Sequence, residues 1–477
     1  MIEFKNVNFR YRGTDESGLH DLSLTINDGE MVLLCGASGC GKTTVGRLIN
    51  GLIPHYYKGE LTGNVLVNGM DIEKTELYEL AGVVGTVFQN PRSQFFAIDT
   101  DGEITFGAEN IGMPPDSIIS RKDDVSSEMH IEKLLGRSIF ELSGGEKQII
   151  ACASVSVLSP DIIVLDEPSS NLDLEAIEKL KEILKRWKLQ GKTIVIAEHR
   201  LYFLRELADR MLILENGRIT KEMTAEEIKK LTITDTEKMG IRPMILPEIQ
   251  YKNSVVESED ILLLEDFCFT YKDGKHGINI PRLELPAYRI IAIIGHNGAG
   301  KSTLARNICG LERKCKGTLT MNGKKMKAKE RLHNCYMIMQ DVNHQLFTES
   351  VRDEVMLSMT DKALTDEQKA SLADEILEQL DLAEYADTHP MALSGGQKQR
   401  TAIASGIASS KSIIIFDEPT SGLDLAHMKQ VADQLKKLKD MGKTVIVVTH
   451  DNEFILSCCD HVVRLENGCI AEDNHKR

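Results

Sequence analysis

Short runs of apolar residues alternate along the chain with longer segments of helical periodicity. Apolar runs occupy residues 31–35, 162–165 and 413–416, and each is followed directly by a glycine or an acidic residue. Residues 175–189 and 428–438 carry instead the spaced apolar positions of amphipathic helices. Because buried strands that alternate with helices form a parallel sheet flanked by those helices, the pattern predicts an α/β fold.

The whole pattern occurs twice. Gly295 lies 259 positions after Gly36, and from Gln89 onward the offset between matching motifs is 251. The first half carries eight extra residues before Gln89, five of them within residues 51–63. A fixed offset across separate motifs indicates that a whole domain is duplicated. We therefore expect a first domain at residues 1–220, a charged, solvated connector at 221–259 and a second domain at 260–477.

Each half has a glycine-rich loop between an apolar run and a helical pattern. Residues 36–43 and 295–302 both read Gly-x-x-x-x-Gly-Lys-(Ser/Thr). Glycines let backbone N–H groups turn toward a polyphosphate, and the helix N-terminus adds partial positive charge. The lysine can reach the phosphates and the hydroxyl can hold Mg²⁺. The predicted phosphate-binding residues are Gly36, Ser38, Gly39, Gly41, Lys42, Thr43, Thr44, Gly295, Asn297, Gly298, Gly300, Lys301, Ser302 and Thr303.

Two apolar runs end in paired acids, Asp166-Glu167 and Asp417-Glu418. A buried strand delivers such acids to the carboxyl edge of the sheet, where the glycine loop also lies. The first acid of each pair suits Mg²⁺, and the second can orient an attacking water. The alternative is a strand that ends in solvated acids, which two glycine loops in one chain make the weaker interpretation.

The segment Leu-Ser-Gly-Gly occurs at residues 142–145 and 393–396, with its serine 23 residues before the first acid of each pair. The serine suits a helix N-cap, and the glycines leave backbone N–H groups exposed. With this signature between the glycine loop and the paired acids, both halves resemble the ATP-binding cassette (ABC) ATPases over nearly the whole chain.

The resemblance implies two tandem cassettes that hydrolyse ATP with Mg²⁺, each with a mainly parallel sheet, an antiparallel β part and a helical subdomain. It also implies that each ATP lies between the glycine loop of one cassette and the signature of the other, so that the cassettes pair within one chain. Matched motif by motif, the implied residues are the adenine-stacking aromatics Tyr11 and Tyr271, the Mg²⁺-sensing glutamines Gln89 and Gln340, the signature residues Ser143, Gly144, Gly145, Ser394, Gly395 and Gly396, the catalytic residues Glu167, Glu418, His199 and His450, and the metal ligands Thr43, Gln89, Asp166, Ser302, Gln340 and Asp417.

Both glutamines begin a shared segment, Gln-x4-Gln-(Phe/Leu)-Phe, at residues 89–96 and 340–347. Together with Ala-Glu-His-Arg-Leu at residues 197–201, these segments resemble the ATPase of energy-coupling-factor (ECF) importers. The resemblance implies a peripheral protein on the cytoplasmic face of the cell membrane that energises import of a vitamin, a related small molecule or a metal ion. Its implied partners are a transmembrane coupling protein and a substrate-binding membrane subunit, without nucleic acid.

Two other functions fit the same motifs. One is a soluble ABC ATPase that acts on ribosomes or nucleic acid, although such fused forms tend to carry a long basic connector or a cysteine-rich metal domain. Here the connector is short and slightly acidic. The other is a nucleotide-binding scaffold without turnover, which the presence of both Glu167 and Glu418 disfavours.

Charge and cysteine content limit the partners and the compartment that we expect for the protein. A net charge of −15 disfavours broad binding to nucleic acid or to an anionic membrane. Ten cysteines without C-x-x-C spacing predict reduced thiols in a cytosolic protein, and no apolar run is long enough to span a bilayer. Residues 1–5 show no signal peptide, so we expect any membrane role to come through a partner.

Two local predictions concern single segments. Cys40 lies inside the first glycine loop beside Lys42, so we expect a lowered thiol pKa and labelling by maleimide that MgATP blocks. The apolar pairs at residues 95–96 and 346–347 predict either a groove for a partner's helix or ordinary core.

Overall fold

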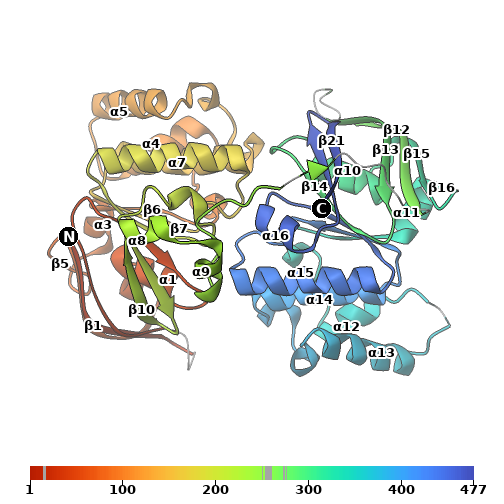
Figure 1. Ribbon diagram of the computed structural model, residues 1–477. Coiled ribbons are helices and arrows are strands. Elements are labelled where there is room, and N and C mark those ends of the chain that lie inside the picture. The colour runs from red at the N-terminus through yellow and green to blue at the C-terminus, as the bar shows by residue number, and fades with distance from the viewer. Residues whose placement is uncertain are drawn as a thin grey trace. The chain divides into compact units, whose positions relative to one another are not determined.

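The computed structural model describes residues 1–13, 18–249, 251–252, 260–271, 274, 277–361 and 363–476. Contacts divide the chain into two units, whose largest segments are Met1–Leu246 in the first, and Pro247–Ser421 and His427–Arg477 in the second (Figure 1). Each unit is a complete cassette, and each is described by itself.

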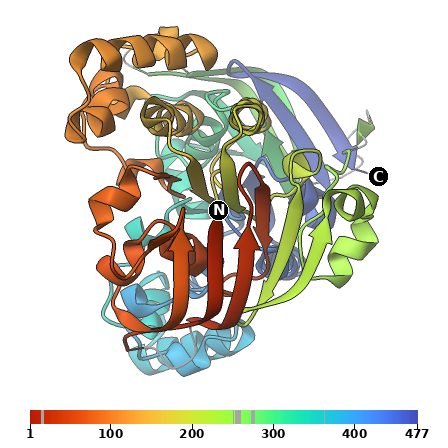
Figure 2. The same cartoon turned by 90° about the vertical axis from the view of Figure 1, so that its left-hand side faces the viewer.

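The first unit contains two sheets. A four-stranded antiparallel sheet has the order β2-β1-β4-β5, and a six-stranded, mainly parallel sheet has the order β10-β9-β3-β8-β7-β6. Figure 2 shows these strands with the N-terminus toward the viewer. The strands are β1 (Ile2–Tyr11), β2 (Gly18–Ile26), β3 (Met31–Cys35), β4 (Gly59–Val67), β5 (Met70–Asp71), β6 (Val84–Val87), β7 (Ile162–Asp166), β8 (Thr193–Ala197), β9 (Arg210–Glu215) and β10 (Arg218–Thr224).

Strand β3 shows why the parallel sheet is buried on both faces. Met31 and Leu33 belong to one apolar cluster, and the alternating Val32 and Leu34 belong to a second. Successive side chains of a strand point to opposite faces, so helices cover one face while the antiparallel sheet and α1 cover the other. The helices are α1 (Lys42–Ile49), α2 (Leu52–His55), α3 (Leu77–Ala81), α4 (Thr100–Asn110), α5 (Pro115–Glu128), α6 (Gly144–Leu158), α7 (Leu174–Leu189), α8 (Ala225–Lys230) and α9 (Ile233–Lys238).

The second unit repeats the arrangement. Its antiparallel sheet has the order β13-β12-β15-β16, and its larger sheet has the order β11-β21-β20-β14-β19-β18-β17. The strands are β11 (Tyr251–Lys252), β12 (Ile261–Thr270), β13 (Gly277–Pro286), β14 (Ile290–Ile294), β15 (Lys316–Met321), β16 (Lys324–Met326), β17 (Cys335–Ile338), β18 (Ile413–Asp417), β19 (Thr444–Val448), β20 (His461–Glu466) and β21 (Cys469–Lys476). The helices are α10 (Lys301–Ile308), α11 (Ala328–Asn334), α12 (Val351–Leu357), α13 (Asp366–Gln379), α14 (Gly395–Ala408), α15 (Leu425–Asp440) and α16 (Asn452–Cys458).

The predicted fold class is confirmed in both units, because parallel strands, an antiparallel part and a helical segment recur in the same order. In the first unit the parallel strands β3 and β7 end at one edge of the sheet, and the glycine loop follows β3 there. In the second unit β14 and β18 end at one edge, and the glycine loop follows β14 there. Among the described residues, no helix is both long enough and apolar enough to cross a bilayer.

The expected connector differs from the structure over its first part. Strand β10 pairs with β9, and the helices α8 and α9 follow it directly. Ile228, Leu231, Ile241 and Met244 are buried in the core of the first unit. Of these residues only Ile228 lies in a helix, and both helices are too short to show periodicity, which is why the segment resembles a solvated linker in sequence. Residues 250 and 253–259 of the expected connector lie outside the described residues.

Candidate nucleotide sites in the two cassettes

The first glycine loop joins β3 to α1 with a backbone that excludes other residues at two positions. Gly36 and Gly41 have φ angles of 138° and 108°. A Cβ on Gly36 would lie 2.2 Å from the carbonyl oxygen of Leu214, so no side chain fits there. Lys42 is buried, and its Nζ donates to the carbonyl oxygens of Gly36 (2.9 Å) and Ala37 (3.0 Å). The loop thus holds its ammonium group inside the turn.

The second loop, between β14 and α10, has the same geometry. Gly295 and Gly300 have φ angles of 146° and 99°, and a Cβ on Gly295 would lie 2.3 Å from the carbonyl oxygen of Leu465. Lys301 Nζ donates to the carbonyl oxygens of Gly295 (2.9 Å) and His296 (3.1 Å). Both predicted phosphate loops therefore have the same conformation and the same lysine contacts.

A hydroxyl and a carboxylate lie together beside each loop. Thr43 Oγ1 donates to Asp166 Oδ1 at 3.1 Å, and Ser302 Oγ donates to Asp417 Oδ1 at the same distance. Burial, joined by the charge of Glu167, raises the pKa of Asp166, although Thr43, Arg47 and Lys42 lower it. Burial likewise raises the pKa of Asp417. A divalent cation would offset this cost of a buried charge, and hard oxygen ligands are the ligands that Mg²⁺ prefers.

These oxygen donors fit Mg²⁺ only together with a nucleotide. Among the described residues, no group of three or more His, Cys, Asp or Glu side chains could hold a metal ion. Mg²⁺ commonly takes one or two protein ligands and completes its shell with substrate phosphates and water. The hydroxyl–carboxylate pair beside a phosphate loop has that composition.

A glutamate and a histidine face each other in each cassette. Glu167 Oε1 lies 3.3 Å from His199 Nε2, and Glu418 Oε1 lies 3.2 Å from His450 Nε2. Gln89 Nε2 also donates to Glu167 Oε2 at 2.7 Å. Each cassette thus brings together its loop, paired acids and histidine, as the motifs predict, and the first shows its glutamine there as well.

The signature segments begin α6 and α14. Ser143 Oγ accepts from the N–H of Glu146, whose carboxylate accepts from the N–H of Ser143, and Ser394 and Gln397 form the same capping box. Glu146 therefore replaces glutamine in its capping role. Among the described residues, no hydrogen bond joins either serine to the glycine loop of its own cassette. The pairing of each loop with the other cassette's signature stays a prediction, because each unit is described by itself.

The two strand-end tyrosines lie beside their own phosphate loops. The hydroxyl of Tyr11 is 3.2 Å from Thr44 Oγ1, and the hydroxyl of Tyr271 is 3.3 Å from Thr303 Oγ1. Both tyrosines therefore lie where α1 or α10 begins, next to the residue that follows the loop hydroxyl.

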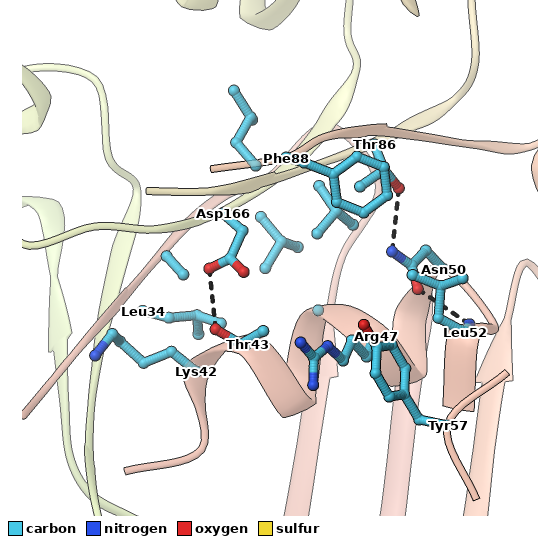
Figure 3. A pocket seen from close by; sticks show the side chains of 15 residues that line it. Leu34, Lys42, Thr43, Arg47, Asn50, Leu52, Tyr57, Thr86, Phe88 and Asp166 are labelled. Carbon is cyan, nitrogen blue, oxygen red and sulfur yellow. Dashed lines mark hydrogen bonds between the residues drawn. The ribbon is translucent and has the colours of Figure 1, made fainter. Parts of the chain in front are cut away.

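Sequence reasoning missed an aromatic and basic cluster in the first cassette. The guanidinium of Arg47 lies 3.9 Å from the ring centroid of Tyr57, and its Nη1 donates to the hydroxyl of Tyr11 at 2.9 Å. Figure 3 shows Arg47 beside Tyr57, in a cavity of about 60 Å³ whose wall also includes Thr43 and Asp166. The signal in the sequence is weak, because Tyr57 belongs to no motif and lies in the segment with extra residues.

The sequence motifs also gave no role to Glu198, although it belongs to the Ala-Glu-His-Arg-Leu segment at residues 197–201. It is buried, and its carboxylate accepts from the N–H groups of Ser169, His199 and Arg200. Burial raises its pKa, with a further contribution from Glu167. Its bonds hold the backbone of His199 against the loop after Glu167.

The prediction of a lowered thiol pKa at Cys40 is wrong. The thiol is 5% exposed, and burial raises its pKa even though Lys42 lowers it. The sequence shows the nearby lysine and N–H groups but not the packing of Cys40 into the apolar cluster with Val32 and Leu34. Desolvation therefore outweighs the positive surroundings.

The apolar pairs after the glutamines are divided between core and surface. Phe95 packs against the core of its unit and Leu346 is buried. Phe96 and Phe347 are exposed, at 75% and 72%, and Phe96 stacks on Phe106 with ring centroids 5.0 Å apart. The expectation of core is thus confirmed for Phe95 and Leu346, whereas Phe96 and Phe347 are exposed and a groove for a partner's helix there stays a prediction.

The sequence profile described as ABC transporter matches residues 19–170 and 278–421. The chain belongs to this family. Two proteins of Treponema denticola, each called "Putative ABC transporter ATP-binding protein", are 47% and 37% identical to it. Their alignments cover 99% of this chain in both cases, and 97% and 96% of the relatives. The protein is thus an ABC ATPase built of two cassettes, which confirms the predicted enzyme class.

Two solved structures match along nearly the whole chain. One holds the archaeal ribosome recycling factor aABCE1 in complex with the archaeal ribosomal stalk protein aP1, with a TM-score of 0.64 and 20% identity. The other is called RNase-L Inhibitor, with a TM-score of 0.63 and 21% identity. Each match covers 98% of this chain and 90% of the solved chain. At this identity the likeness establishes the fold of two tandem cassettes.

The comparison contradicts the predicted ECF importer. The solved chains that match both cassettes together include a ribosome recycling factor and RNase-L Inhibitor. The other expectations that came from the same resemblance are wrong with it. They are the transmembrane coupling protein, the membrane substrate-binding subunit, the exclusion of nucleic acid, and the position on the cytoplasmic face of the membrane.

The geometry explains why the importer motif misled. Its second glutamine, Gln94 or Gln345, accepts the N–H of Phe88 or Met339 through Oε1 at 3.2 Å. A glutamate of the helix that follows, Glu103 in α4 or Glu354 in α12, accepts two N–H groups, one from the second residue of the apolar pair and one from the next residue. These shared residues shape a loop inside their own cassette. The motif therefore reports local backbone geometry and not the identity of a partner.

Proposed function

We propose that the chain is an ATP-driven conformational switch with two hydrolytic centres. The observation that carries this proposal is the duplicated glutamate–histidine pair, 3.3 Å apart in one cassette and 3.2 Å in the other, beside two phosphate loops of the same conformation. Each pair places a carboxylate and an imidazole beside a phosphate loop, so each cassette has the groups that hydrolysis requires.

The residues have distinct roles in the proposed reaction. Lys42 and Lys301, with the loop N–H groups, bind the β- and γ-phosphates, and Tyr11 and Tyr271 stack on the adenine. Mg²⁺ would be held by Thr43, Gln89 and Asp166, or by Ser302, Gln340 and Asp417, and would neutralise charge on the phosphate oxygens. Glu167 and Glu418 orient the attacking water and accept its proton. His199 and His450 hold those carboxylates in position and face the γ-phosphate.

For the assembly on which the switch works, we propose a ribosome. Support comes from the tandem arrangement, which matches a ribosome recycling factor over 98% of this chain. With a net charge of −15, the chain is poorly suited to bind RNA phosphates over a broad surface, so a protein component of the ribosome is the expected contact.

Sedimentation tests the proposed partner. The Glu167→Gln/Glu418→Gln variant, which should retain ATP, is centrifuged with ribosomes and, separately, with membrane vesicles from the same cells. We expect it to pellet with ribosomes in MgATP and to stay in the supernatant in MgADP. The Lys42→Ala/Lys301→Ala variant, which cannot hold the phosphates, is the matched control. Pelleting with vesicles alone, or equal ribosome binding by the control, would exclude a nucleotide-dependent ribosomal role.

A further inference from the structure

The two cassettes differ at the end of the nucleotide site where the adenine is expected. The first cassette carries five extra residues within residues 51–63. They accompany the short helix α2 and bring Tyr57 against α1, whereas the second cassette passes from α10 to β15 without such an element. Tyr57 is half-buried, while the neighbouring Tyr56 is 71% exposed.

Tyr57 joins a cluster that ends on Tyr11. Its ring lies under the guanidinium of Arg47, at 3.9 Å, and meets the ring of Tyr11 edge-on, with centroids 6.3 Å apart at 88°. Arg47 Nη1 in turn donates to the hydroxyl of Tyr11 at 2.9 Å. Figure 3 shows the guanidinium and the Tyr57 ring side by side. Tyr11 is thus held at its hydroxyl by Arg47 and at its ring by Tyr57.

The described residues of the second cassette do not repeat this support. Arg306 stands where the first cassette has Arg47, but it is exposed, whereas Arg47 is half-buried. In the described part of the second cassette, Arg306 makes no hydrogen bond to Tyr271 and stacks on no aromatic ring. Two contacts of Tyr271 match those of Tyr11: the bond between its hydroxyl and Thr303, and the edge-on packing of its ring against Phe269.

We propose that Tyr57 is a positioning residue that makes the first cassette the tighter ATP site. The inference rests on the proposed stacking of adenine on Tyr11. A side chain that is already ordered loses less conformational entropy when a ligand binds to it. Tyr57 acts through Tyr11 and Arg47, because perpendicular rings 6.3 Å apart leave no parallel slot for a base between them.

Calorimetry with MgATP on the full chain tests this asymmetry, in a Glu167→Gln/Glu418→Gln background that prevents turnover. Adding Lys301→Ala removes ATP binding at the second site, so that the affinity of the first site is measured alone. Adding Lys42→Ala removes binding at the first site in the same way. We expect the first site to bind more tightly. Tyr57→Ala should weaken it about tenfold, within the range of a cation–π contact. Tyr57→Phe should retain the affinity, because the ring is kept. Tyr78→Ala, at a tyrosine that is 72% exposed, is the control and should change nothing.

Tripolyphosphate, which has no base, separates positioning from general damage. Tyr57→Ala should leave tripolyphosphate binding at the first site and ATP binding at the second site unchanged. Equal loss of ATP and tripolyphosphate would mean that the segment merely supports the phosphate loop, and equal affinity of the two wild-type sites would also overturn the proposal. If Lys42→Ala did not weaken ATP in the first cassette, the proposed phosphate site itself would be wrong.

Discussion

Glu167 and His199 face each other with Oε1 and Nε2 3.3 Å apart, and Glu418 and His450 repeat the contact at 3.2 Å. The backbone of each glutamate is strained, with φ angles of 44° and 50°. Left-handed backbone at a non-glycine residue costs on the order of 1–3 kcal/mol, and both cassettes have it at the glutamate that faces the histidine. The two centres have the same local geometry, although the surroundings of Tyr11 and Tyr271 differ.

The close approach of the first glycine loop to β9 predicts a large effect for Gly36→Ala. The new Cβ would lie 2.2 Å from the carbonyl oxygen of Leu214, at a φ angle of 138°. Gly39→Ala is the matched control, because Gly39 also has a positive φ, 80°, but nothing within 4 Å of the added Cβ. In urea denaturation, Gly36→Ala should lower the free energy of unfolding by about 2 kcal/mol more than Gly39→Ala. If the two variants had equal free energies of unfolding, the loop would have shifted to relieve the contact between the new Cβ and Leu214.

Asp166→Asn should stabilise the protein without nucleotide. Burial raises the pKa of Asp166, so the folded chain holds its proton more tightly than the unfolded chain. The protonated carboxyl therefore adds most to the free energy of unfolding below the pKa that it has in the unfolded chain. That contribution is lost as the pH rises through the pKa of the folded chain. At pH 7 asparagine removes this cost, and we expect a gain of about 1 kcal/mol in the free energy of unfolding.

The same substitution should remove the extra stability that MgATP confers, because a neutral amide is a poorer ligand for Mg²⁺ than a carboxylate. Thermal melting with and without MgATP at pH 7, and without nucleotide at pH 4, measures both effects. The difference from wild type should shrink at pH 4, where Asp166 is protonated in a larger fraction of folded wild-type chains. A variant less stable than wild type at pH 7 would show that the carboxylate supports the fold.

The buried thiol of Cys40 predicts slow labelling. Burial raises its pKa, so little thiolate is present near neutral pH, and the side chain is 5% exposed. At pH 7.5 a maleimide should modify the exposed Cys469 first and leave Cys40 largely unreacted, with or without MgATP. Peptide mass spectrometry after brief labelling identifies the modified residue. Rapid modification of Cys40 that MgATP prevents would restore the expectation of a reactive thiol.

Features made by neighbouring residues could be predicted from the sequence. The glycine loops, the acids at strand ends and the capped signature helices each depend on a few consecutive residues, so their spacing alone places Lys42, Asp166 and Ser143 correctly in the fold. The duplication then allowed each motif to support the interpretation of its copy.

Features made by packing between distant segments could not be predicted. The contact of Tyr57 with Arg47 depends on how a loop folds back on α1, and the raised pKa of Cys40 depends on an apolar cluster assembled from several strands. The partner was mispredicted for a related reason. Gln94 and Glu103 make hydrogen bonds within their own cassette, so their pattern carries no information on what the surface contacts.

The central claim is that both cassettes hydrolyse ATP and that Glu167 and Glu418 are their catalytic glutamates. The direct measurement is rapid-quench release of phosphate per chain in a single turnover, with ATP preloaded and Mg²⁺ added. The wild type should release two phosphates per chain. Glu167→Gln and Glu418→Gln should each release one, and the double variant should release phosphate at least about a hundredfold more slowly while retaining two ATP. One phosphate from the wild type, or unchanged release from the double variant, would contradict the account.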